Sequence, residues 1–281
     1  MNLSKKILAY INITRPLNVL ITFFVVVVAI LISQTNQIDT AKIIFASLTA
    51  ALVTAGGNIV NDIYDIETDR ISHPDRVLVQ RLISKKEAVI LYGIFNTLAI
   101  IISAKLSDLL LIIVLISIII LFTYSYHLKK LPLIGNLIVA FLTGLAFIYG
   151  GFAADNPGAA IVPAAFAFFV NMIREVVKDM LDIEGDSKVG IITFPIKYGL
   201  QKSKILILIV TFSLILYTLY PFITELYKIE YFMVVMVFIN SLLILCLKFL
   251  FDAKNGNNLS VVSNMLKLNM VLGLIAIYLG K

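Results

Sequence analysis

The sequence predicts an all-α integral membrane protein built as a bundle of nine transmembrane helices around a central cavity. Three observations carry this prediction. The chain is 60% hydrophobic and only 14% charged, its mean hydropathy is +1.00, and apolar stretches of about twenty residues recur along all 281 residues. About twenty helical residues cross a ~30 Å hydrocarbon core. An ordinary soluble domain is therefore excluded, and we expect one transmembrane domain covering residues 1–281.

The predicted spans are separated by short polar connections. They cover residues 17–34, 41–64, 86–104, 108–126, 133–153, 158–181, 203–221, 230–251 and 262–280. The first apolar run lacks a small-residue cleavage site, so we expect it to be a retained helix and not a signal peptide. Before it, Leu3 to Ile13 is expected to form a short interfacial helix that stops at Arg15-Pro16, because proline disfavours helix in the residue before it.

Basic residues set the expected orientation. With the N-terminus in the cytoplasm, the outer side keeps only Lys42, Lys105, Lys228 and Lys281, and the remaining Lys and Arg residues fall at the inner side. This asymmetry fits the positive-inside rule. It predicts a multi-pass protein of the cell membrane whose acidic segments face the cytoplasm. The net charge of +6 then reflects topology and needs no nucleic acid.

The first acidic segment, residues 58–76, follows the second span. Asn61, Asp65 and Asp69 are spaced i, i+4 and i+8, which places them on one face of a helix, with Asp62 one residue round. Like charges so placed repel each other. Mg²⁺ prefers oxygen ligands and keeps several waters, so it would relieve this repulsion while also holding a phosphate.

The second acidic segment, residues 174–186, follows the sixth span. Glu175, Asp179, Asp182 and Asp186 have spacings of four, three and four, so one helical face again carries the set. Each segment holds five acidic residues, and together they hold ten of the 17 in the chain. Solvated loop carboxylates would explain a single acid but not this repeated spacing.

Together the two segments suggest a site for two Mg²⁺ ions and one diphosphate. Metals bridge carboxylates to phosphate oxygens, and Arg76, Lys178 and either Lys129 or Lys130 can reach the remaining oxygens. If the organic half is an allylic chain, departure of the diphosphate leaves a delocalised carbocation, which the apolar bundle would shelter from water.

These segments resemble motifs of the UbiA superfamily of intramembrane prenyltransferases. NDIYDIETD (Asn61 to Asp69) with HPDR (His73 to Arg76) looks like the first aspartate-rich motif, and KDMLDIEGDSKVGIITFPIKYG (Lys178 to Gly199) is similar to the second. RPLN (Arg15 to Asn18) and YSYHLKKLPLIGN (Tyr124 to Asn136) also resemble family patterns. After Arg76 the chain reads VLVQRLIS, where the family usually has a run such as PIPSGRIS.

The resemblance implies Mg²⁺-dependent transfer of a prenyl group from a polyprenyl diphosphate to a lipophilic acceptor, with Asp65, Asp69 and Asp182 as catalytic residues. By position, one Mg²⁺ is expected at Asn61, Asp65 and Asp69 with Asp62 nearby, and the second at Asp179, Asp182 and Asp186. The substrate-binding residues are expected to be Arg15, Asn18, Arg76, Lys129, Lys130, Arg174 and Lys178.

Within the superfamily, the motifs most resemble members that move a geranylgeranyl group to the free hydroxyl of geranylgeranylglyceryl phosphate, forming the second ether bond of archaeal membrane lipids. An aromatic acceptor, 4-hydroxybenzoate or another quinone precursor, is the alternative. A secondary transporter is remote, since its acids should lie mid-span. A CDP-alcohol phosphotransferase would need a DG-x2-AR signature, which the sequence lacks. We infer no obligate protein partner. Either Asp182 or a diphosphate oxygen could take up the acceptor proton.

Overall fold

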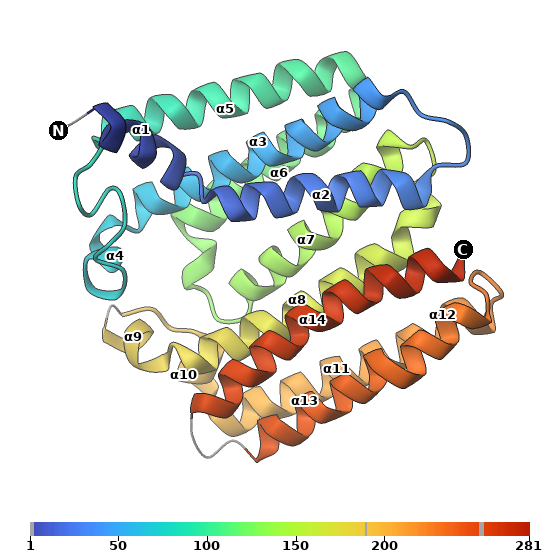
Figure 1. Cartoon of the computed structure of the whole chain (residues 1–281). Coiled ribbons are helices and arrows are strands. Elements are labelled where there is room, and N and C mark those ends of the chain that lie inside the picture. The colour runs from blue at the N-terminus through green and yellow to red at the C-terminus, as the bar shows by residue number, and fades with distance from the viewer. Residues whose placement is uncertain (1–2, 189, 253–255) are drawn as a thin grey trace. The chain divides into compact units, whose positions relative to one another are not determined.

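The structure is a computed structural model that describes residues 3–188, 190–252 and 256–281, all helices and their connections (Figure 1). Within this described part, nine helices are long and apolar enough to cross a membrane. The prediction of an all-α multi-pass protein with nine spans is confirmed. The predicted cytoplasmic N-terminus and Val189 of the second motif lie outside the described residues. The predicted central cavity stays a prediction.

The chain divides into two compact units, Met1–Lys129 with Ala146–Ala160 and Lys130–Leu145 with Ile161–Lys281. The elements up to the end of η2 are α1 (Leu3–Asn12), α2 (Pro16–Ser33), α3 (Thr40–Tyr64), α4 (Ile66–Ser72), α5 (Lys85–Leu106), α6 (Asp108–Tyr126), η1 (Leu128–Lys130), α7 (Ile134–Ala153) and η2 (Pro157–Ala160). They are followed by α8 (Ile161–Leu181), α9 (Ile183–Lys188), α10 (Phe194–Tyr198), α11 (Leu200–Ile223), α12 (Ile229–Val234), η3 (Val235–Asn240), α13 (Ser241–Phe251) and α14 (Gly256–Gly280).

Helix α3 is the centre of the first unit and contacts α2, α5 and α6. Its glycines permit this close packing. A Cβ atom on Gly56 would lie 2.9 Å from the Asn96 amide oxygen on α5, and one on Gly57 would lie 3.0 Å from Leu121 on α6. Small residues of this kind let membrane helices approach closely. The end of α3, which carries the first acidic segment, is therefore held by two neighbouring helices.

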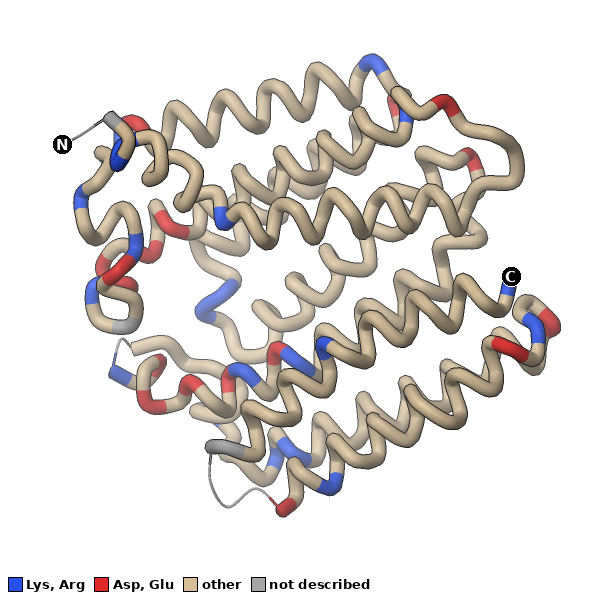
Figure 2. Tube along the Cα trace, in the orientation of Figure 1, with Lys and Arg blue, Asp and Glu red and all other residues tan. Residues whose placement is uncertain are grey.

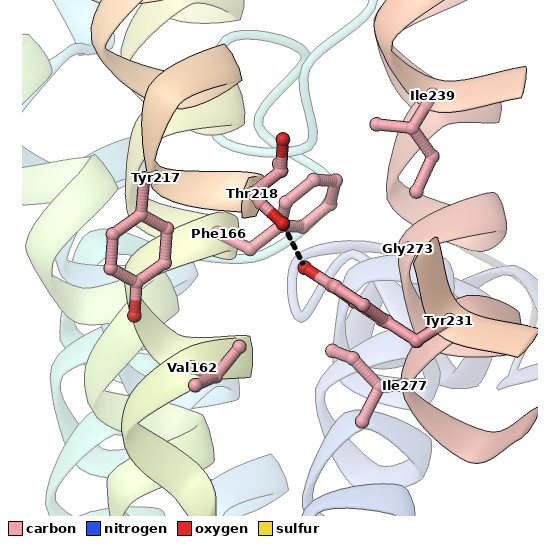
Figure 3. A pocket seen from close by; sticks show the side chains of 8 residues that line it. All are labelled: Val162, Phe166, Tyr217, Thr218, Tyr231, Ile239, Gly273 and Ile277. Carbon is pink, nitrogen blue, oxygen red and sulfur yellow. Dashed lines mark hydrogen bonds between the residues drawn. The ribbon is translucent and has the colours of Figure 1, made fainter. Parts of the chain in front are cut away.

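Helix α8 has the same central place in the second unit, where it contacts α11 and α14. A small cavity lies between these helices and α12–η3 (Figure 3). The Tyr231 hydroxyl donates a 2.9 Å hydrogen bond to the Thr218 carbonyl beside this cavity. Its lining consists of Val162, Phe166, Tyr217, Thr218, Tyr231, Ile239, Gly273 and Ile277. Since the lining includes none of the predicted site residues, this cavity is not the predicted site.

Most Lys, Arg, Asp and Glu residues lie near the ends of the long helices (Figure 2). The mainly apolar middle parts of these helices suit a hydrocarbon environment, in which a helix satisfies its own backbone hydrogen bonds. The seventh span, predicted at 203–221, runs from Leu200 to Ile223. It begins directly after Gly199, whose φ of 86° is left-handed, and it continues through Pro221.

Both acidic segments are interrupted helices, which corrects the prediction of one unbroken helical face in each. Helix α3 ends at Tyr64 and α4 begins at Ile66, with Asp65 between them at φ −97° and ψ 3°. Helix α8 ends at Leu181 and α9 begins at Ile183, with Asp182 between them. Carboxylates four residues apart destabilise a continuous helix, which favours a break at this point in the acidic column.

The turn after the first acidic segment contains an arginine in an unusual, left-handed backbone conformation. Leu82 N–H donates to the Val77 carbonyl and Arg81 N–H to the Leu78 carbonyl, the two bonds of a Schellman motif. This motif requires a left-handed residue at its penultimate position, and Arg81 has a φ of 56°. Glycine is the usual residue there, and Arg81 stands where the resembling family run PIPSGRIS has its glycine.

We therefore predict that Arg81→Gly raises the free energy of unfolding. Left-handed backbone costs a non-glycine residue about 1–2 kcal/mol, and the extra freedom of glycine in the unfolded chain offsets about 0.5–1 kcal/mol of the relief. The expected net gain is about 0.5 kcal/mol, measured as a rise in the melting temperature of the detergent-solubilised protein. Gln80→Gly, the matched control at a negative φ, should lower the melting temperature. A lower melting temperature for Arg81→Gly than for Gln80→Gly would contradict this account.

Candidate active site

Asp62, in the last turn of α3, is the most deeply buried carboxylate of the first acidic segment. Its side chain is 2% exposed, and the Arg15 guanidinium lies 2.5 Å from its Oδ1. The Arg76 guanidinium lies 3.8 Å from the same oxygen. Arg15 is the left-handed residue, φ 54°, that precedes Pro16 at the start of α2. Two predicted substrate-binding arginines thus converge on one predicted metal ligand.

Lys129 pairs with Asp65, and its Nζ also lies 3.4 Å from the Asn61 side-chain oxygen. The Lys129 and Asp65 side chains are 11% and 16% exposed, so this ion pair is largely shielded from water. Asn61 and Asp65, the i, i+4 pair predicted from spacing, therefore both contact Lys129, which lies in the segment after α6. Of the two lysines left open by the sequence, Lys129 reaches the first acidic segment, and Lys130 is exposed.

Asp69, in α4, is 7% exposed. Burial raises the pKa of its carboxyl above the usual value, the Asp65 and Asp62 carboxylates raise it further, and Arg76 and His73 oppose the shift. Negative charge at this position is therefore unfavourable as the segment stands. A bound cation would relieve it, which is what a metal site built from these carboxylates requires.

Other polar residues of this region remain at the surface. Glu67 and Arg70 form an exposed ion pair of 2.8 Å, and such pairs contribute little to stability. Asn18 is exposed on the first turn of α2, and its backbone N–H donates to the Arg15 carbonyl. Asn18 therefore supports the Arg15 turn through its backbone.

The second acidic segment, in the second unit, has its own basic partners. Arg174 Nη1 lies 3.1 Å from Glu175 Oε1, and Lys178 Nζ lies 3.5 Å from Glu175 Oε2. Asp179 accepts a 2.9 Å hydrogen bond from the Asn136 amide of α7. Arg174 and Lys178, the predicted substrate-binding cations on α8, thus both pair with Glu175, while Asp179 has a neutral partner.

Asp182 and Asp186 flank the short helix α9. Asp182 is exposed at the break between α8 and α9, and Asp186 is half-buried. Burial raises the pKa of Asp186 to about 6, with a further contribution from the Asp182 carboxylate and an opposing one from Lys178. As at Asp69, the environment of this carboxylate disfavours its charged form.

The donor atoms of both segments fit Mg²⁺, since carboxylate and amide oxygens are the ligands this ion prefers. The carboxylates are not drawn together in a metal cage: the described residues contain no group of three or more His, Cys, Asp or Glu side chains arranged to hold an ion. Basic or amide side chains instead contact Asp62, Asp65 and Asp179. The donor atoms therefore fit Mg²⁺, and basic or amide side chains already contact these three acids.

Sequence reasoning did not assign three polar contacts made by the helices that carry the two acidic segments. Asn136 is 8% exposed and holds Asp179, the Asn58 amide donates to the Thr14 carbonyl at 2.8 Å, and Asn171 donates to Thr143. In the sequence, Asn136 and Asn171 are polar residues within the predicted apolar spans 133–153 and 158–181. That is a usable signal, because polar groups within membrane helices are costly unless they have a partner.

The chain matches the UbiA prenyltransferase family over residues 20–271. It belongs to the UbiA prenyltransferase family. A UbiA relative from Methanosphaera stadtmanae, named digeranylgeranylglyceryl phosphate synthase, is 30% identical over 96% of this chain and 98% of its own.

Solved structures show the same fold. One, described as giving structural and mechanistic insights into digeranylgeranylglyceryl phosphate synthase in membranes, superposes with a TM-score of 0.86 at 32% identity and covers 98% of both chains. A UbiA homologue from Archaeoglobus fulgidus, solved bound to GPP and Mg²⁺, superposes with a TM-score of 0.71 at 19% identity, covering 96% of this chain and 99% of its own. The predicted UbiA resemblance is thereby confirmed for the fold and the family.

We predict that Lys129→Ala makes the protein both less stable and more responsive to Mg²⁺. Removing one partner of a shielded ion pair leaves Asp65 uncompensated, which costs about 3 kcal/mol. An ion bound at the vacated carboxylate would recover part of this loss by mass action. Thermal unfolding, measured with EDTA and then with rising Mg²⁺, should show a larger stabilisation in the variant than in the wild type.

Lys42→Ala is the matched control. It breaks a 2.9 Å ion pair with Asp155, whose side chain is 84% exposed, so we expect a loss below about 1 kcal/mol and the wild-type response to Mg²⁺. An equal Mg²⁺ response in Lys129→Ala and the wild type would show that Lys129 does not occupy a cation position.

Proposed function

We propose that this protein is a Mg²⁺-dependent prenyltransferase that transfers the geranylgeranyl group of geranylgeranyl diphosphate to the free hydroxyl of geranylgeranylglyceryl phosphate. The product carries the second ether bond of archaeal membrane lipids. The observation that carries the proposal is the full-length similarity to digeranylgeranylglyceryl phosphate synthase, at 32% identity and a TM-score of 0.86 over 98% of both chains. The buried and half-buried acids that contact basic side chains in the two acidic segments support it.

We assign the metal-binding role to both acidic segments. Asn61, Asp62, Asp65 and Asp69 would hold one Mg²⁺, and Asp179, Asp182 and Asp186 would hold a second. Bound Mg²⁺ neutralises the diphosphate and so improves it as a leaving group. The raised pKa values of Asp69 and Asp186 support the assignment, because burial and neighbouring carboxylates disfavour the charged form of each, and a bound cation would stabilise it.

The basic side chains are proposed to bind the diphosphate. In the first segment, Asp62 pairs with Arg15 and Arg76, and Asp65 pairs with Lys129. In the second segment, Glu175 pairs with Arg174 and Lys178. Arginine forks and lysine ammonium groups bind phosphate oxygens well. When metal and diphosphate bind together, these cations exchange carboxylate for phosphate partners, so the charge of the site stays balanced throughout. We give Lys130 and Asn18 at most an accessory role, since both are exposed.

The transfer step forms a carbon–oxygen bond to the acceptor and breaks the allylic carbon–oxygen bond of the donor. Diphosphate leaves with the electron pair, and the acceptor hydroxyl loses its proton. Asp182 is exposed between α8 and α9, so its carboxylate can take up this proton, as can an oxygen of the departing diphosphate. Asp65 and Asp69 act as catalytic residues through the donor diphosphate that they help to hold.

The nine apolar helices and the family make this a multi-pass membrane protein. We further propose that it lies in the cell membrane with the acidic segments at the cytoplasmic side, because the basic residues concentrate at that side of the predicted topology. Both compact units would belong to one prenyltransferase domain spanning residues 1–281. The substrates are lipids, and no protein partner is needed.

The test is an assay of purified protein in lipid or detergent with labelled geranylgeranyl diphosphate and Mg²⁺. One reaction offers geranylgeranylglyceryl phosphate, and a second offers 4-hydroxybenzoate. We expect ether product only in the first, and none after EDTA treatment. Asp65→Ala and Asp182→Ala should each lower kcat/KM by at least about a hundredfold, since each removes a ligand that no neighbour replaces.

Asp155→Ala serves as the control, because Asp155 is an exposed acid in the turn between α7 and η2 and should leave activity unchanged. Product only with 4-hydroxybenzoate would keep the metal assignment and replace the acceptor with an aromatic one. Failure to release diphosphate with any acceptor would overturn the proposed reaction.

A further inference from the structure

Glu87, in the first turn of α5, lies outside both acidic segments but is contacted by three residues from two segments of the first unit. Lys6 Nζ lies 2.6 Å from Oε1, and the Tyr10 hydroxyl donates to the same oxygen at 2.8 Å. The Ser84 backbone N–H and hydroxyl both donate to Oε2 at 2.7 Å. One carboxylate therefore joins helix α1 to the N-terminus of helix α5.

The two segments that Glu87 joins also share one hydrophobic cluster. Its buried members are Ala9, Ile13, Ile59, Ile63, Val77, Leu78, Ile83 and Ala88, from α1, α3, the 73–84 connection and α5. Tyr10 packs against this cluster from its edge. The polar junction at Glu87 thus closes one side of a packed group that includes the end of α3.

Each joined segment leads within a few residues to an arginine on Asp62. Arg15 follows the end of α1 at Asn12, and the intervening Thr14 carbonyl is held by Asn58 of α3. Arg76 directly precedes the Schellman turn formed by residues 77–82, which ends two residues before Ser84, and its side chain lies 3.8 Å from Asp62. The positions of α1 and of Ser84 therefore influence the backbone positions from which the Arg15 and Arg76 side chains extend toward Asp62.

A purely stabilising role would be the simpler explanation of these contacts. The Ser84–Glu87 pair is a capping box, whose loss costs about 1 kcal/mol. The Lys6 and Glu87 side chains are 40% and 30% exposed, and exposed ion pairs contribute little. Global stability therefore depends only modestly on Glu87. What the capping box alone does not explain is the arm to α1, which reaches across 77 residues of sequence to Tyr10.

We propose that Glu87 is a positioning residue for the donor diphosphate, acting through Arg15 and Arg76. This inference rests on the proposed function, since it assumes that these arginines bind the diphosphate. Groups that orient a binding residue commonly change affinity by 10–100-fold without touching the ligand. Loss of Glu87 should accordingly act on binding of the donor more than on the chemical step.

The test uses full-length protein and steady-state kinetics. Glu87→Ala should raise the KM for geranylgeranyl diphosphate about tenfold, with kcat and the KM for the acceptor within about twofold. Lys6→Ala combined with Tyr10→Phe removes only the α1 arm and leaves the capping box, and it should reproduce most of the effect. Glu87→Gln, which can still accept from Ser84, should give a smaller rise. Asp155→Asn, which weakens a different ion pair of the same unit, should give none.

A double-mutant cycle separates positioning from stability. If Glu87 acts through Arg15 and Arg76, then Glu87→Ala should change the donor KM less than about twofold in a background that carries both Arg15→Ala and Arg76→Ala, because coupled residues are not additive. Equal effects in both backgrounds, or a fall in melting temperature and kcat with no change in donor KM, would overturn the inference while leaving the proposed function intact. Wild-type protein that does not bind prenyl diphosphate would overturn both.

Discussion

The structure depends on how basic side chains compensate the carboxylates at the ends of apolar helices. An ionised side chain withdrawn from water is costly unless a counter-charge stands beside it. Asp62 is 2% exposed and has two arginines near it, and the nearly buried Asp65 has Lys129. The same cations that make these acids tolerable are the groups suited to hold a diphosphate. In the proposed mechanism, one set of residues therefore both balances charge in the resting protein and binds the substrate.

The two acidic segments share a local plan. In each, a long helix rich in close packing contacts ends one residue before an aspartate, and a short polar helix follows. The Asp65 and Asp182 N–H groups still bond to carbonyls four residues back, and Asp69 and Asp186 bond back to them in turn. The backbone thus stays nearly helical across each break, while the break itself relieves like-charge repulsion along the column.

Much of this could be predicted from the sequence, because hydropathy sets the spans and helical spacing groups the acids. The nine spans and the grouping of Asn61 with Asp65 follow from those periodicities alone. Local patterns could not show which cation meets which acid, since Arg15, Arg76 and Lys129 reach the segment from distant parts of the chain. The predicted spans end at residues 64 and 181, where α3 and α8 end, but local patterns could not show that the short helices α4 and α9 begin directly after Asp65 and Asp182. Arg81 likewise occupies a left-handed position that its residue type does not predict.

The central claim is that each acidic segment contributes one Mg²⁺ when the donor binds. The most direct measurement is the affinity for an unreactive geranylgeranyl thiodiphosphate as a function of free Mg²⁺, held below the range in which the free ligand itself binds the ion. In the wild type, the logarithm of the association constant should rise with the logarithm of Mg²⁺ concentration with a slope of about two, and Asp65→Asn and Asp179→Asn should each reduce the slope to about one. A slope near zero in the wild type, or slopes that neither substitution changes, would contradict the account.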